Sequence, residues 1–327
     1  MNISPIEDNL RLSVRDLGVE ISSSTGPKSI VEGISFDLHK SEVFAIVGES
    51  GCGKSLTAIA MIRLLPEGLV AKGEVVLPGI GNVLTLEASD LRAVRGGQVG
   101  VVFQNSASVL SPVHTVRWHL RRALWNHHKC SRVEADAICR QLLSSVGLDD
   151  GARVLKSYSH ELSGGMRQRV LIAMALIGGA TTLIADEPTT ALDASVRRRV
   201  LGLLENLVKS EKRSVILISH DLALVEEVSD RIAVMYAGQF VEVGEAAAII
   251  DEPLHPYSRG LVSSTPRLGV PPKSVMAGRP PTWAEYPNGC RFAERCQYSE
   301  DRCRKEAQVI RWVSQDRSVR CWKAGEC

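Results

Sequence analysis

The chain has 327 residues, more than one hydrophobic core usually organises, so we expect one large domain with an appendage, or two domains. Its 39 Lys and Arg residues nearly balance 37 Asp and Glu residues, for a net charge of +2. That balance argues against a sequence-independent DNA binder and against charge-driven attachment to acidic membranes. With 44% hydrophobic and 23% charged residues, the composition is that of a globular protein.

The N-terminus carries Glu7 and Asp8 rather than the apolar core of a secretory signal. No stretch of the sequence approaches the roughly 18–20 unbroken apolar residues that a membrane-spanning helix needs. We therefore expect a cytosolic protein, in which cysteines stay reduced.

The first part of the chain predicts two strands, residues 11–21 and 29–39, joined by a segment rich in turn formers. Further short apolar runs predict buried strands that alternate with helical patterns; they cover residues 42–47, 98–103, 182–185 and 214–218. This alternation indicates an α/β domain built around a largely parallel sheet.

Residues 115–178 have mainly helical patterns, including a capping box formed by Ser131 and Glu134 and a helix end at Gly147. Eight of the 14 prolines fall between Pro253 and Pro287, which predicts a linker without regular helix or central strand.

A glycine-rich segment between the strand over 42–47 and a helix predicted over 56–65 matches the pattern GxxxxGK[ST]. It comprises Gly48, Glu49, Ser50, Gly51, Cys52, Gly53, Lys54 and Ser55, and Leu56 begins the helix. Such a loop turns its backbone N–H groups toward phosphates. Lys54 is expected to reach the β and γ phosphates and Ser55 to ligate Mg²⁺. Positive potential in the loop is expected to lower the pKa of Cys52.

Hydrolysis of a γ-phosphate also needs a carboxylate near Mg²⁺ and a group that activates water. Asp186 and Glu187 supply both at the end of a buried strand. We expect Asp186 to hold the metal through water and Glu187 to polarise the nucleophile.

The segment 162–166, Leu-Ser-Gly-Gly-Met, resembles the signature motif of the ATP-binding cassette (ABC) ATPases, with Met in place of the usual Gln. It opens a helix predicted over 167–177. The resemblance implies a head-to-tail dimer in which Ser163, Gly164 and Gly165 of one cassette close over the nucleotide held by the other.

Three further positions are similar to family motifs. Gln104 resembles the Q-loop glutamine, a further Mg²⁺ contact; residues 191–193, ending in Asp193, resemble the D-loop; and His220 resembles the switch histidine near the γ-phosphate. Where related cassettes place an aromatic residue that stacks on adenine, this chain has Ile21, which implies weaker affinity or base preference. Gln104, Glu187 and His220 are the implied catalytic residues.

The resemblance implies a P-loop NTPase cassette over residues 1–252. It would combine a RecA-like core, an N-terminal antiparallel β subdomain and a helical signature subdomain at about 105–180. Residues 253–327 would form a proline-rich linker and a cysteine-rich extension, because residues 255–261 resemble the extension of dipeptide, oligopeptide and nickel importers.

The extension carries four cysteines in the order Cys-x5-Cys-x6-Cys-x17-Cys: Cys290, Cys296, Cys303 and Cys321. Four cysteines in a short cytosolic segment favour metal ligation over disulfides, and both zinc and an iron–sulfur cluster use thiolates. A tail without metal remains an alternative. Family members carry a 4Fe–4S cluster at these positions, so the resemblance implies that cluster in a structural role.

The implied function is that of the ATP-binding and ATP-hydrolysing subunit of a bacterial importer for dipeptides or oligopeptides, using ATP and Mg²⁺. The implied partners are a second, different cassette subunit, two membrane permeases and, indirectly, an extracytoplasmic binding protein. We expect no nucleic-acid partner and a peripheral position on the cytoplasmic face of the inner membrane. Nickel, opine or metallophore cargo is an alternative, as is an ABC ATPase in a soluble complex without transport.

Overall fold

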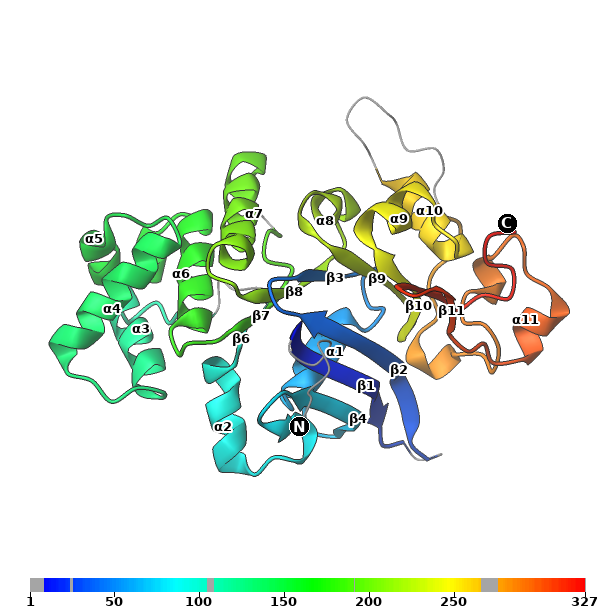
Figure 1. Ribbon diagram of the computed structural model, residues 1–327, viewed down its shortest axis with the longest axis horizontal. Coiled ribbons are helices and arrows are strands. Elements are labelled where there is room, and N and C mark those ends of the chain that lie inside the picture. The colour runs from blue at the N-terminus through cyan, green and yellow to red at the C-terminus, as the bar shows by residue number, and fades with distance from the viewer. Residues whose placement is uncertain (1–8, 24–25, 105–108, 191, 266–275, 327) are drawn as a thin grey trace. The chain divides into compact units, whose positions relative to one another are not determined.

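The computed structural model describes residues 9–23, 26–104, 109–190, 192–265 and 276–326 (Figure 1). The chain divides into two compact units. One unit comprises Met1–Leu38, Val43–Leu84 and Leu217–Cys327, and the other comprises His39–Glu42 and Thr85–Ile216. We refer to them as unit 1 and unit 2.

Unit 1 begins with an antiparallel sheet of strand order β2-β1-β4-β5. Its strands are β1 (Leu10–Ile21), β2 (Lys28–His39), β4 (Leu69–Leu77) and β5 (Gly81–Asn82). Along β2 the side chains of Ile34, Phe36 and Leu38 are buried at every second position, as expected for a strand with one face on the core.

Further strands of unit 1 are hydrogen-bonded in the order β11-β12-β10-β9-β3. They are β3 (Val43–Val47), β9 (Arg231–Tyr236), β10 (Gln239–Glu245), β11 (Arg311–Ser314) and β12 (Arg317–Val319). β3 pairs with β9 in parallel, whereas β9–β10, β10–β12 and β11–β12 are antiparallel.

The parallel pairing expected for the strand over 42–47 is confirmed by β3 with β9. The antiparallel pairs come from β10, β11 and β12, which the sequence does not predict as strands. β9 and β10 are joined by Ala237 and Gly238 alone, with φ of 46° and 82°. A two-residue turn with positive φ at both positions can join only antiparallel strands.

The helices of unit 1 are α1 (Lys54–Met61), α8 (Leu222–Val228), α9 (Ala246–Asp251), α10 (Pro256–Ser264) and α11 (Asp301–Lys305). Short 3₁₀ turns lie at Val83–Thr85, Trp283–Glu285 and Ala293–Arg295.

Helix α10 corrects the prediction that the proline-rich stretch contains no helix. Pro256 sits in the first turn, where its missing N–H costs nothing. The ring of His255 caps the helix by accepting a 3.0 Å hydrogen bond from the Tyr257 N–H. Residues 266–275 of the predicted linker lie outside the described residues.

In unit 2, strands β6 (Val99–Val102) and β7 (Thr182–Asp186) pair in parallel. Its helices are α2 (Ala88–Gly97), α3 (Val116–Trp125), α4 (Arg132–Ser145), α5 (Gly151–Lys156), α6 (Gly164–Leu176) and α7 (Ala194–Lys209), with a 3₁₀ turn at Ser159–Glu161. Strand β8 (Ser214–Ser219) carries the chain from unit 2 into unit 1. Helices α3 to α6 cluster together in Figure 1.

The helical prediction for 115–178 is confirmed by α3 to α6. The predicted capping box is present at the start of α4, where Ser131 and Glu134 exchange side-chain-to-backbone hydrogen bonds. Gly147, with φ of 73°, follows the end of that helix, as predicted.

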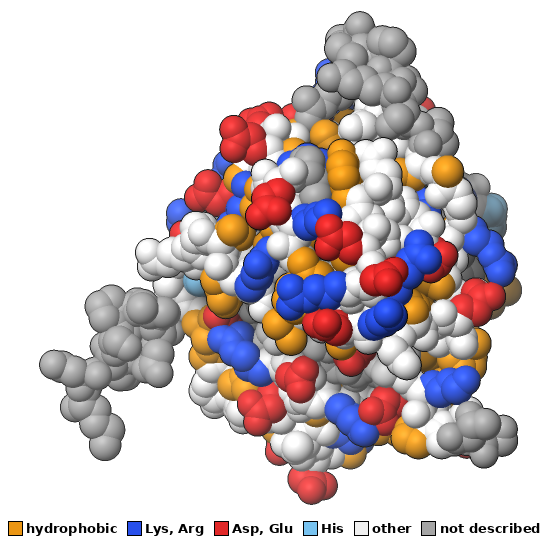
Figure 2. Space-filling model, turned by 90° about the vertical axis from the view of Figure 1, so that its right-hand side faces the viewer, with side chains coloured by type: hydrophobic (Ala, Val, Ile, Leu, Met, Phe, Trp, Pro, Cys, Tyr) orange, Lys and Arg blue, Asp and Glu red, His pale blue; other side chains and the backbone are white. Residues whose placement is uncertain are grey.

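The charged side chains of the surface are mixed in sign. On the face that Figure 2 shows, basic and acidic groups are interspersed. Exposed pairs in the last part of the chain, such as Arg279 with Glu285 and Arg302 with Glu306, contribute little to stability. Among the described residues, no helix is both long and apolar enough to cross a membrane.

Candidate nucleotide site

The predicted phosphate loop lies in unit 1, where it follows the fully buried strand β3 and leads into α1. A side chain at Gly48 would place its Cβ 2.1 Å from the Met235 carbonyl oxygen of β9, so only glycine fits this close approach. The loop is further fixed by the Gly238 N–H, which donates to the Cys52 carbonyl at 2.8 Å. The turn between β9 and β10 thus packs against the phosphate loop and holds it by a hydrogen bond.

Lys54 is buried, and its ammonium group donates to the carbonyl oxygens of Gly48 at 2.8 Å and Glu49 at 3.0 Å. Ser55 and Leu56 occupy the first turn of α1 and are partly exposed. The helix begins at Gly53 without a side-chain cap, so its first N–H groups can serve an anion. This arrangement suits phosphate binding.

The expectation for Cys52 is wrong. Burial raises the pKa of the Cys52 thiol, and the opposing effect of Lys54 is smaller. The side chain is only 2% exposed, so desolvation of the thiolate outweighs the positive potential.

Asp186 and Glu187 lie in unit 2, at the end of the buried strand β7. Asp186 is 4% exposed, whereas Glu187 is half-buried and has a φ of 50°. The Glu187 carboxylate accepts a 2.9 Å hydrogen bond from the Thr190 hydroxyl. A φ of 50° lies in the left-handed region, so the extended backbone of β7 ends before Glu187.

Gln104 is exposed and follows β6 by two residues. Because β6 and β7 are parallel, with Val102 opposite Ala185, Gln104 and Asp186 lie at the same edge of this strand pair. Unit 2 thus collects an amide and two carboxylates at one edge, a donor set that suits Mg²⁺.

The signature residues begin α6. The Ser163 hydroxyl caps the helix by accepting a 3.2 Å hydrogen bond from the Met166 N–H. Gly164 follows it, and a Cβ on Gly165 would lie 2.2 Å from the Val196 side chain of α7. Gly165 therefore allows α6 to start against the beginning of α7.

Asp193 caps α7 in the same unit. The Val196 N–H and the Ser195 hydroxyl donate to its carboxylate, and these bonds lower its pKa below the usual range. Ala191 of the predicted D-loop lies outside the described residues.

Two predicted residues lie in unit 1 away from the loop sequence. His220 is exposed directly after β8, and Ile21 is the last residue of β1, paired with Leu69 of β4. The residues predicted for the nucleotide site are thus divided between the units. The phosphate loop, Ile21 and His220 belong to unit 1, and the other nucleotide-site residues belong to unit 2.

The four predicted cysteine ligands all line one small cavity of unit 1. The Cys290 N–H donates to the Cys303 carbonyl at 2.7 Å. Burial raises the pKa of the Cys290 thiol to about 11, and the other three cysteines add to that rise. Among the residues the structure describes, no group of three or more His, Cys, Asp or Glu side chains is arranged to hold a metal ion. The cluster therefore stays a prediction.

Sequence reasoning missed two residues of the extension that contact the phosphate loop, Tyr257 and Arg295. The Glu49 N–H donates to the Tyr257 hydroxyl at 3.0 Å, and Arg295 forms an ion pair with the Glu49 carboxylate. No spacing rule predicts these contacts, since Arg295 lies 246 residues from Glu49 along the chain.

The sequence matches two family descriptions. Residues 31–190 match the ABC transporter family, and residues 241–303 match the C-terminal region of oligopeptide/dipeptide transporters. The chain is 42% identical over 317 residues to the dipeptide transport ATP-binding protein DppD of Bacillus subtilis, covering 95% of this chain and 94% of that protein. It is 39% identical over 331 residues to a probable peptide ABC transporter ATP-binding protein, y4tR, of Sinorhizobium fredii, covering 100% and 98%.

A solved structure has the same fold. It is the dimeric post-hydrolysis state of the ATP-binding cassette MJ0796 bound to ADP and Pi, with a TM-score of 0.62 at 24% identity, covering 72% of this chain and 98% of that one. Together with the full-length relatives, this confirms the predicted P-loop cassette fold. The chain belongs to the ABC transporter family and is an ATP-binding, ATP-hydrolysing subunit.

Proposed function

We propose that this ATPase drives import of dipeptides or oligopeptides through two membrane permeases. The observation that carries the proposal is the match of one chain both to the ABC transporter family and to the oligopeptide/dipeptide C-terminal region. The relatives with peptide-transport names cover nearly the whole chain. In this proposal residues 1–252 form the cassette, with its helical subdomain at about 105–180, and residues 253–327 form the extension.

The cassette works as one half of a head-to-tail pair with a second, different cassette subunit. Lys54 and the loop N–H groups would bind the phosphates of ATP. Ser55, Gln104 and Asp186 would hold Mg²⁺. The signature residues Ser163, Gly164 and Gly165 act on the nucleotide of the partner cassette, and Asp193 crosses the interface. The pair docks on the permeases at the cytoplasmic face of the inner membrane, and an extracytoplasmic binding protein delivers the peptide.

Hydrolysis depends on Glu187, which polarises the attacking water, and on His220, which contacts the γ-phosphate. General-base assistance contributes about 10²–10⁴-fold to rate. The hydrogen bond from Thr190 holds the Glu187 carboxylate in one orientation. Removing its charge therefore stops turnover without removing the phosphate-binding groups.

The experiment uses the intact chain in a bacterium whose own copy of the gene is deleted. Wild-type protein should restore uptake of labelled dipeptides, whereas Glu187→Gln should fail to restore it and should still bind ATP. Full ATPase activity in the purified Glu187→Gln protein would contradict the assignment of Glu187. Restored uptake of nickel, opines or metallophores without peptide uptake would contradict the cargo.

The cysteines form a second part of the proposal. We propose that a 4Fe–4S cluster cross-links and stabilises the extension. Its ligands would be Cys290, Cys296, Cys303 and Cys321. Support comes from the four cysteines, which all line one cavity together with His255. A four-iron cluster also spaces its thiolates further apart than a single ion does. Iron and sulfide analysis of anaerobically purified protein tests it: iron-free protein, or zinc in its place, would contradict the cluster.

A further inference from the structure

An arginine of the C-terminal extension, Arg295, binds the phosphate loop. Both terminal nitrogens of Arg295 reach the Glu49 carboxylate, at 2.9 Å and 3.0 Å. The Arg295 side chain is 7% exposed and that of Glu49 is 24% exposed. A two-point pair shielded from water fixes geometry far better than an exposed ion pair does.

Contacts other than the one to Glu49 also hold the Arg295 side chain in place. Its guanidinium carbon lies 5.7 Å from the ring centre of Tyr236 and 5.8 Å from that of Phe292. One nitrogen donates to the Tyr236 hydroxyl at 3.3 Å, and Nε donates to the Ala277 carbonyl at 2.9 Å. The guanidinium therefore has one orientation available, which is the one that faces the loop.

Tyr257 of α10 provides a second contact to the same loop residue. Its hydroxyl accepts the hydrogen bond from the Glu49 N–H, and its fully buried ring lies 4.6 Å from Tyr236 and 5.5 Å from Phe292. Burial raises the pKa of Tyr257, so the hydroxyl stays neutral. Both the backbone and the side chain of Glu49 are thus bound by the extension.

Glu49 in turn holds the lysine of the loop. Its carbonyl oxygen, with that of Gly48, accepts the hydrogen bonds of the Lys54 ammonium group. We propose that Arg295 is a positioning residue for ATP binding, which acts through Glu49 to keep the phosphate loop and Lys54 in the geometry that receives phosphates.

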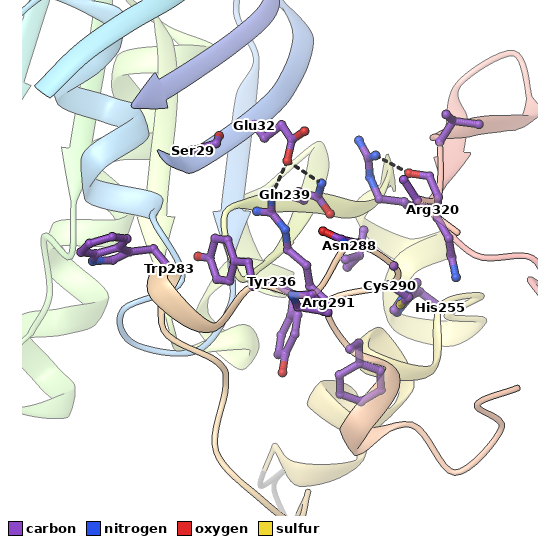
Figure 3. Close-up of a pocket in the computed structure, with 18 of the residues that line it drawn as sticks. Ser29, Glu32, Tyr236, Gln239, His255, Trp283, Asn288, Cys290, Arg291 and Arg320 are labelled. Carbon is purple, nitrogen blue, oxygen red and sulfur yellow. Dashed lines mark hydrogen bonds and ion pairs between the residues drawn. The ribbon is translucent and has the colours of Figure 1, made fainter. Parts of the chain in front are cut away.

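The segment that carries Arg295 is anchored close by. Arg291 donates to the Ala237 carbonyl at 2.6 Å, forms an ion pair with Glu32 of β2 and lies 4.1 Å from the Tyr286 ring centre. Arg291 and Glu32 line a pocket of about 550 Å³, which Tyr236 and Cys290 also line. Figure 3 shows the contact between Arg291 and Glu32.

The cysteines connect this anchor to the predicted cluster. Cys290 and Cys296 bracket the residues from Arg291 to Arg295 in the sequence, so the folding of the cysteine-bearing segment places the arginine. The competence of the loop for ATP then depends on an intact extension. The inference rests on the proposed role of the loop in binding ATP.

The test compares purified full-length Arg295→Met, Arg295→Lys, Glu49→Gln and the double variant Arg295→Met with Glu49→Gln. The matched control is Arg279→Met, which removes an exposed pair within the extension. ATP affinity is measured by titration calorimetry, and ATPase assays give KM and kcat separately. We expect Arg295→Met and Glu49→Gln each to raise KM on the order of ten-fold with kcat changed far less, because pre-organisation is lost. The control should leave KM unchanged.

The double variant should be no worse than either single variant, because each removes the same interaction. Arg295→Lys should recover part of the affinity, since it keeps the charge but not the two-point geometry. Unchanged KM in Glu49→Gln, or fully additive effects in the double variant, would overturn the proposal. If Arg295→Met fails to fold, Glu49→Gln decides alone, since it leaves the extension intact. A wild-type chain that does not bind ATP would instead contradict the role of the loop itself.

Discussion

Two helices begin at predicted phosphate-binding motifs, and they begin in different ways. Helix α1 starts at Gly53, which has a φ of 108° and no side chain to accept the first N–H groups. Helix α6 starts at Ser163, whose hydroxyl already accepts the Met166 N–H. Each helix end presents unpaired N–H groups and a positive dipole to an anion.

The difference indicates an order of events. The first N–H groups of α1 need no rearrangement to receive phosphate, whereas a phosphate approaching Ser163 competes with an existing hydrogen bond. A net intramolecular hydrogen bond contributes about 1 kcal/mol. We therefore expect the phosphate loop to bind ATP first and the signature helix to join later, when a second cassette closes.

The largest expected effect comes from removing the positive charge of Lys54, the first residue of the uncapped helix α1. Lys54→Met should weaken ATP binding by about 100-fold, because hydrogen bonds to a charged group contribute about 1.5–3 kcal/mol. Titration calorimetry measures the dissociation constant. Lys209→Met, which removes an exposed pair with Glu205, is the control and should bind ATP as wild type does. Equal affinity in both variants would show that α1 alone carries binding.

A second change tests the close start of α6 against α7. Gly165→Ala forces a Cβ against the stiff side chain of Val196 and should cost about 1–3 kcal/mol of unfolding free energy. Adding Val196→Ala should restore most of the loss. Gly164→Ala is the matched control for stability, because its Cβ would make an ordinary 3.4 Å contact with Leu192. Denaturant unfolding measures all three, and no rescue by Val196→Ala would contradict the steric explanation.

A third change places a serine at the N-cap of α1, as Ser163 is at the N-cap of α6. Gly53→Ser should fail as a cap and should cost about 1–2 kcal/mol, because a non-glycine residue is strained at a φ of 108°. Gly202→Ala, in the interior of α7 with open space around it, should instead stabilise the protein slightly. The pair is compared by thermal unfolding. A stabilising Gly53→Ser would mean that the helix start adapts.

The smallest effect is expected from removing the cap of α6. Ser163→Ala should cost about 1 kcal/mol of stability and lower ATP turnover, while ATP affinity of the isolated chain stays unchanged. Ser131→Ala removes a comparable cap from α4 and serves as the control. It should lose similar stability and keep full turnover. Equal turnover in the two variants would assign Ser163 a purely structural role.

Features determined by neighbouring residues could be predicted from the sequence. The loop from Gly48 to Ser55, the capping box of α4 and the buried strand before Asp186 all depend on local chemistry, and each lies where it was expected. The comparisons with known proteins also confirm the cassette fold and the ATPase assignment.

Features that depend on distant contacts could not be predicted in the same way. The pairing of β10 with β12 joins segments about 75 residues apart, and the contact of Arg295 with Glu49 spans 246 residues. The helix at Pro256 is not evident from the sequence, because proline interrupts most helices and is accommodated only in the first turn. The raised pKa of Cys52 cannot be predicted from the loop motif, because the motif does not show that this side chain is buried.

The pairing of β12 with β10 has a practical consequence for how the protein can be shortened. Glu242 of β10 is fully buried and is neutralised by Arg317, which approaches to 2.7 Å, and by the N–H groups of Leu254 and His255. All three partners follow residue 252. A chain cut there would present both an open strand edge and a carboxylate that has lost its donors, two defects that promote self-association through strand addition. Proteolytic trimming of the extension should therefore release an aggregating fragment rather than a smaller working ATPase.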